Sequence, residues 1–96
     1  MLRFATKEKL KTLLASNKAT LVDMRSPVQF RDDPISGAVN LPLRNLVNSL
    51  VLMKDKKKPL ILFGIDPKDS DVKTGVTYAE NLCFENIYVT DLKQLK

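Results

Sequence analysis

"KPLILFGIDPKDSDVKTG", residues 58–75, leads from an apolar run into a polar loop and the start of a helix. Residues 59–63 are apolar at every position, which is typical of a strand in a sheet covered on both faces. The loop begins at Gly64, and the pattern predicts a helix from Ser70 or Asp71 to Leu82. A strand followed by a loop and a helix N-terminus is a layout that α/β enzymes use to place a nucleophile or to hold an anion.

Outside this stretch, helix and strand signals alternate. Further strands are predicted at residues 3–5, 20–24, 38–42 and 86–90. Helices are predicted at residues 7–16, 26–30 and 43–53, with a final helical turn or frayed end at 91–96. Alternation with short links indicates βαβ units. The predicted fold class is therefore α/β: a small, mostly parallel central sheet with helices on both faces, in a single domain over residues 1–96.

The spacing of apolar residues predicts which side of each helix faces the sheet. Ser26 is a suitable N-cap for the short second helix, and Pro27 suits its first position. The predicted inward-facing residues are Leu10, Leu13 and Leu14 in the first helix, Leu43, Val47, Leu50 and Met53 in the third, and Val72, Val76, Ala79 and Leu82 or Cys83 in the fourth.

The composition, 44% hydrophobic and 28% charged over 96 residues, is that of an ordinary globular protein. No apolar run approaches the roughly 20 residues needed to span a bilayer, so no membrane partner is expected. The expected location is the cytoplasm. One cysteine and no histidine exclude a disulfide framework and a Cys/His zinc site. No metal and no cofactor are therefore expected.

The net charge of +5 does not by itself indicate nucleic-acid binding. The only dense basic cluster, at residues 54–58, is interrupted by Asp55 and contains no aromatic residues for base stacking. A solvated helix end and loop is the better interpretation, and no nucleic-acid partner is expected. The basic residues 1–20 would also suit a transit peptide, but their apolar spacing favours the first helix of the domain.

Four segments resemble the successive signatures of single-domain rhodanese-like proteins, which have the sulfurtransferase fold. They are LVDMRSPVQF (21–30), ISGAVNLPL (35–43), KPLILFG (58–64) and FENIYV (84–89). The matching positions are Asp23, Arg25, Gly37, Ala38, Asn40 and Pro42. The resemblance covers nearly the whole chain and implies a rhodanese-like fold.

Several of these residues are interpreted as scaffold. An Asp beside an Arg at a strand end can form a charge-assisted pair that ties loops together, which is the role expected of Asp23 and Arg25. Gly37 permits a backbone conformation closed to other residues at the turn into a strand. Asn40 belongs to the same scaffold group through the resemblance.

In an active rhodanese, the resemblance implies a cysteine at the end of the central strand, with loop amides directed at its sulfur. Gly64 stands at that position. The loop also has a formal charge of −1, from three aspartates and two lysines in residues 65–73. These departures predict a catalytically inactive domain that acts as a binding or regulatory module. The predicted loop residues are Gly64, Ile65, Asp66, Lys68, Asp69, Ser70, Asp71 and Lys73, contacting a protein partner or a small anion. The oligomeric state stays open.

Two alternatives remain. The first is a thiosulfate or persulfide sulfurtransferase, or a sulfur carrier, that uses Cys83 or a partner's thiol; a buried core role is the expectation for Cys83. The second is an EF-hand-like calcium loop, in which Asp69, Asp71 and Glu80 take the first, third and twelfth places. Lys73 stands where that loop needs an oxygen ligand, so helix-capping chemistry explains the carboxylates better.

Overall fold

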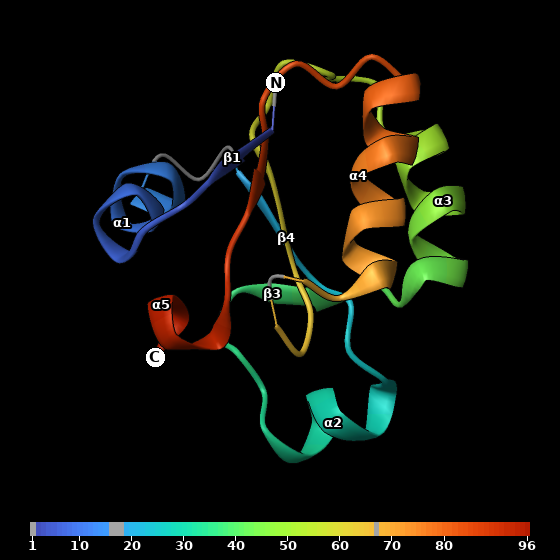
Figure 1. Ribbon diagram of the computed structural model, residues 1–96. Helices are drawn as coiled ribbons and strands as arrows, with labels where there is room; N and C mark the ends of the chain where they lie inside the picture. Colours follow the sequence, from blue (N-terminus) through green and yellow to red (C-terminus); the bar gives the residue numbers. More distant parts are fainter. Residues whose placement is uncertain (1, 16–18, 67) are drawn as a thin grey trace.

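The computed structural model describes residues 2–15, 19–66 and 68–96, in which strands and helices alternate (Figure 1). In chain order these are β1 (Leu2–Phe4), α1 (Lys7–Ala15), β2 (Thr20–Asp23), α2 (Pro27–Asp32), β3 (Ala38–Asn40), α3 (Leu43–Leu52), β4 (Leu60–Phe63), α4 (Ser70–Asn81), β5 (Ile87–Val89) and α5 (Leu92–Leu95). The predicted elements are present, and their ends differ from the predicted ranges by a residue or two. Ser16, the predicted end of the first helix, lies outside the described residues.

The strands form one five-stranded sheet in the order β1-β5-β4-β2-β3. Each of its four strand pairings is parallel, which confirms the predicted α/β class. β4 lies at the centre, between β5 and β2. In a parallel sheet all carboxyl ends lie at one edge, so the loops that follow β2 and β4 meet there.

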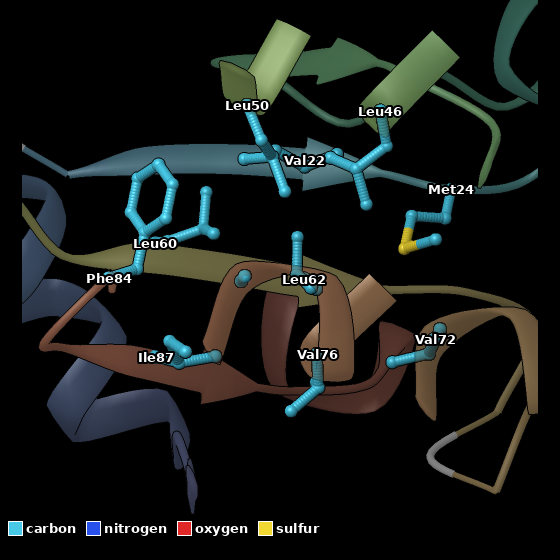
Figure 2. Packing of buried hydrophobic residues seen from close by; sticks show 11 residues of the cluster. Val22, Met24, Leu46, Leu50, Leu60, Leu62, Val72, Val76, Phe84 and Ile87 are labelled. Atoms are coloured by element: carbon cyan, nitrogen blue, oxygen red, sulfur yellow. The ribbon is translucent and has the colours of Figure 1, made fainter. Parts of the chain in front are cut away.

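Two hydrophobic clusters cover the two faces of the sheet, as the apolar β4 predicts. Leu60 and Leu62 point to a cluster completed by α3 and α4 (Figure 2). Ile61 and Phe63 point to the other cluster, with α1 and, partly buried, α5. This alternation follows from the two-residue period of a strand. α2 contributes no buried residue and lies beyond the end of the sheet in Figure 1.

Gly75 allows α4 to approach its neighbours closely. A Cβ atom at this position would lie 2.8 Å from Cδ2 of Leu46 and 3.0 Å from Cε of Met24. Glycine inside a helix costs about 0.5–1 kcal/mol relative to alanine. Here that cost is offset because the missing side chain lets α4 pack closely against Leu46 of α3 and against Met24, which follows β2.

The structure contradicts the prediction of an inward-facing side chain at two residues, Val47 and Cys83. In α3 the buried residues are Leu46 and Leu50, one turn apart, and Val47 is only partly buried. Cys83 is exposed, not in the core. The helix before it ends in a Schellman motif, in which the Cys83 N–H donates to Glu80 O at 3.0 Å and the Phe84 N–H donates to Ala79 O at 3.1 Å.

This motif explains where the thiol lies. It requires a left-handed residue directly after the helix cap, and Cys83 adopts it with φ 69°. The chain then reverses so that Phe84, not Cys83, enters the core.

Candidate functional site

The candidate site lies where β2 and β4 end side by side. Asp23 is in register with Phe63, and the Met24 N–H donates to Phe63 O at 2.8 Å just beyond the strands. The residue that follows β4 is the buried Gly64. From there the loop leads to Asp69, the N-cap of α4.

The loop's own carboxylates accept hydrogen bonds from its amides. Asp69 Oδ1 accepts from the Asp71 N–H at 2.9 Å, and Asp69 Oδ2 accepts from the Ile65 N–H at 3.4 Å. Asp66 Oδ1 accepts from the Lys68 N–H at 2.7 Å. These amides therefore already have an anionic partner within the chain.

The space beside Gly64 is filled. A Cβ atom there would lie 2.7 Å from Asp69 Oδ2 and 2.9 Å from Val72 Cγ2. Both distances are shorter than real Cβ contacts. Val72 is 1% exposed and begins the buried face of α4, so it has little freedom to move away.

Most of the predicted loop residues are exposed to solvent. Ile65 is 60% exposed, a large apolar side chain in solvent. Asp69 is half-buried because it caps α4. The other exposed side chains of the loop and first helical turn are Asp66, Lys68, Ser70, Asp71 and Lys73. Among the described residues, Lys68 and Lys73 take part in no ion pair.

Asp23 and Arg25 form a buried ion pair behind the loop. Arg25 Nη2 lies 2.8 Å from Asp23 Oδ2, and Asp23 Oδ1 also accepts from the Arg25 N–H at 2.9 Å. The hydrogen bond to Asp23 raises the pKa of Arg25, against the opposing effect of burial. Arg25 Nη2 also donates to Asp33 O at 2.7 Å, so the pair ties the end of β2 to the segment after α2.

Two other scaffold residues hold the same region. Asn40 Nδ2 donates to the backbone oxygens of Asp23 and Arg25 at 3.0 and 2.9 Å. Gly37 has φ 81°, the left-handed conformation, at the turn before β3. The geometry of these residues places them in backbone support rather than on the exposed loop surface.

Some residues of this edge carried no recognisable signal in the sequence. Lys96 Nζ donates to Asp33 Oδ2 at 2.6 Å, although the two residues are far apart in the chain. The Lys96 ammonium lowers the pKa of Asp33, with a smaller effect from Arg25. Only the fold brings α5 beside the segment after α2.

Two hollows border the loop, and sequence reasoning found neither. One of about 510 Å³ is lined by residues that include Met24, Ser26, Leu43, Arg44, Asn45 and Asp71. The other, of about 300 Å³, is lined by Ile65, Asp66, Asp91, Leu92 and Lys93. Both depend on how loops after different strands converge, and that arrangement is tertiary.

Cys83 lies away from this edge. It follows the C-terminal end of α4, a helix of 12 residues whose first turn belongs to the site. At 1.5 Å per residue, such a helix is about 18 Å long.

Across residues 2–15, 19–66 and 68–96 there is no group of three or more His, Cys, Asp or Glu side chains placed to hold a metal ion. In the same residues, no helix has the length and apolar character needed to cross a membrane.

Several solved structures resemble this one. The Alr3790 protein from Anabaena sp. has a TM-score of 0.78 at 21% sequence identity, covering 95% of this chain and 83% of that one. The single-domain sulfurtransferase RDL2 from Saccharomyces cerevisiae has a TM-score of 0.75 at 20% identity, with coverages of 99% and 89%. The human single-domain sulfurtransferase TSTD1 gives 0.72 at 23% identity, with 91% and 87%. No curated protein sequence matches the chain.

The family comparison agrees with the structural one. The model of the rhodanese-like domain matches residues 6–91, from the start of α1 to the start of α5. The matched segment contains the central sheet from β2 to β5 and the loop after β4. This chain therefore belongs to the rhodanese-like domain family.

Proposed function

We propose that this rhodanese-like domain has no sulfurtransferase nucleophile of its own after β4, and that it acts as a binding or regulatory module through the surface of residues 64–73. The family resemblance implies a cysteine directly after the central strand, where this chain has Gly64. The observation that carries the proposal is the filled space at that residue, where an added Cβ would lie within 3.0 Å of Asp69 Oδ2 and Val72 Cγ2, so that one of them must move to admit a side chain.

The hydrogen bonds of the loop support the same conclusion. Loop amides that converge on a sulfur stabilise a thiolate, a persulfide or an incoming anion. In this chain Asp69 accepts from two of the loop N–H groups, those of Ile65 and Asp71. At about 5 Å, each carboxylate also repels an anionic sulfur donor by on the order of 1–3 kcal/mol.

A thiosulfate–cyanide assay tests whether the domain lacks sulfurtransferase activity. We expect no thiocyanate formation above the protein-free background, for the wild type and for Cys83→Ser alike. Turnover that persists in Cys83→Ser would require another sulfur-accepting group in the chain, and the proposal would then be wrong.

A second candidate, a sulfur carrier, is favoured by one observation: the Cys83 thiol is exposed. In this reaction the Cys83 thiolate attacks the outer sulfur of thiosulfate, forming a persulfide and releasing sulfite. Cyanide then takes up the outer sulfur as thiocyanate and regenerates the thiolate. A partner's thiol entering beside Gly64 is a less suitable route, because it meets the Asp69 carboxylate.

Intact-mass measurement separates the two candidates. The protein is incubated with thiosulfate or a low-molecular-weight persulfide, and its intact mass is then measured by mass spectrometry. A gain of one sulfur atom that is lost on reduction and absent from Cys83→Ser supports the carrier. An unchanged mass in both proteins supports the binding module.

A further inference from the structure

The smaller hollow at this edge is lined by both apolar and charged residues. Ile65 and Leu92 are its apolar lining residues, and Asp66, Asp91 and Lys93 are its charged ones. The loop supplies Ile65 and Asp66, while α5 and its N-cap supply the others. Two segments distant in sequence therefore build one concave surface of about 300 Å³, at the small end of the range for ligand pockets.

Its two carboxylates are fixed in orientation, and each keeps an oxygen available. Asp66 Oδ1 accepts from the Lys68 N–H at 2.7 Å, and Asp91 Oδ1 accepts from the Gln94 N–H at 3.1 Å. Within the described part of the chain, Oδ2 of neither residue takes part in a hydrogen bond or an ion pair. Little conformational entropy is lost when a ligand binds carboxylates that the backbone already holds.

The chemistry of the lining selects a cation with an apolar stem. Two carboxylates and Lys93 give the lining a formal charge of −1, in a chain whose net charge is +5. Arginine and lysine side chains place an apolar stem along apolar surface and keep the charged head at a polar rim. A small inorganic cation would leave the exposed Ile65 without a function, and an anion would meet both carboxylates.

We propose that the hollow between Ile65 and Leu92 receives an arginine or lysine side chain of a partner protein, with its apolar stem against Ile65 and Leu92 and its charged head at Asp66 and Asp91. This inference rests on the proposed function and specifies the chemistry of the partner. Lys93 opposes the binding, so the affinity for a single side chain is low and depends on salt.

The test uses the ¹⁵N-labelled protein, residues 1–96, titrated with a capped leucine–arginine–leucine tripeptide and followed by NMR. We expect saturable shifts of the amides of residues 65, 66 and 91–93. The matching leucine–glutamate–leucine tripeptide should give no shifts there. A lysine tripeptide should behave as the arginine one does.

Variants test the charges without disturbing the backbone. Asp66→Asn and Asp91→Asn keep Oδ1 as an acceptor, so the Lys68 and Gln94 hydrogen bonds remain. Each should weaken tripeptide binding about two- to fivefold, the range for a surface ion pair. Lys93→Gln should strengthen it by a similar factor. Glu80→Gln removes the same charge from an exposed position on α4, outside the hollow, and should leave tripeptide binding unchanged.

Three outcomes overturn the inference: no saturable shift with either cationic tripeptide, equal shifts with the glutamate tripeptide, or unchanged affinity in Asp66→Asn and Asp91→Asn. Shifts confined to the larger hollow, at Arg44 and Asn45, would also refute it while leaving a binding module in place. A sulfur adduct in the mass experiment refutes the proposed function instead, so the two failures are distinguishable.

Discussion

Replacing Gly64 by cysteine would supply the nucleophile that the family resemblance leads one to expect, and the structure predicts that this single change fails. The added Cβ would lie 2.7 Å from Asp69 Oδ2 and 2.9 Å from Val72 Cγ2. The Asp69 side chain can rotate away, but only by giving up its hydrogen bonds to Ile65 and Asp71. Val72 is β-branched and helical, so one rotamer dominates and it cannot make room in this way.

The expected cost has two parts. Forcing extra atoms into a packed site costs about 1–3 kcal/mol. Losing the N-cap interaction of Asp69 costs about 1 kcal/mol more. Gly64→Cys should therefore lower the free energy of unfolding by about 2–4 kcal/mol. For a chain of this size, each kcal/mol lowers Tm by about 4–8 °C.

Urea denaturation and the thiosulfate–cyanide assay are applied to the same set of variants. Gly64→Ala adds the Cβ without a thiol and separates the steric cost from the chemistry. Asp69→Ser keeps an oxygen at the N-cap and shortens the side chain that blocks Gly64. Combined with Asp69→Ser, Gly64→Cys should lose less stability than it does alone, because only the contact with Val72 remains.

If Gly64→Ala changes the free energy of unfolding by less than about 0.5 kcal/mol, the usual range for a surface substitution, the space beside Gly64 accepts a side chain and the expected clash is absent. Robust sulfur transfer by Gly64→Cys alone would equally show that the loop carboxylates are no obstacle.

Three further predictions concern the scaffold and the end of α4. Cys83→Gly should raise the free energy of unfolding by about 1 kcal/mol, because glycine adopts the left-handed conformation without strain; a decrease in denaturation experiments would contradict this. Arg25→Met should lower it by about 3–5 kcal/mol, since Asp23 is then left buried and unpaired, and a loss below 1 kcal/mol in the same experiment would refute the pairing argument. Lys96→Gln should raise the pKa of Asp33 toward its ordinary value, as measured by NMR titration. Because the folded-state pKa of Asp33 is lowered, its contribution to stability is present above the unfolded pKa and is lost as pH falls through the folded one. An unchanged pKa would show that Lys96 makes no such contact in solution.

The central strand and its surroundings could be predicted because their signals are local. The run at 59–63 has the composition of a strand buried on both faces, and Ser26 with Pro27 marks the start of α2 by capping chemistry. In the structure, Ser26 accepts from the Gln29 N–H in a capping box. Alternation of such elements was enough to predict the α/β class and the edge where the loop lies.

What could not be predicted depends on contacts across the chain or on backbone conformation. The position of Cys83 beside Leu82 and Phe84 suggested burial, but the Schellman motif turns its side chain outward. The side chain of Asp69 faces Gly64 because the loop folds back on itself, and no spacing rule predicts that. The hollow shared by Ile65 and Leu92 arises only when α5 packs beside the loop.

Gly75 lies in the α3–α4 interface and lines neither hollow at the loop, yet it sets the distance at which α4 packs against Leu46 and Met24. The same helix begins at the loop and carries Asp71 and Val72 in its first turn. A side chain at position 75 would press on Leu46 and Met24, and any shift of α4 in response would change the spacing beside Gly64. A random-mutagenesis screen for lost partner recognition should therefore recover changes at this interior position together with surface changes, and only a measurement of folding stability would tell the two groups apart.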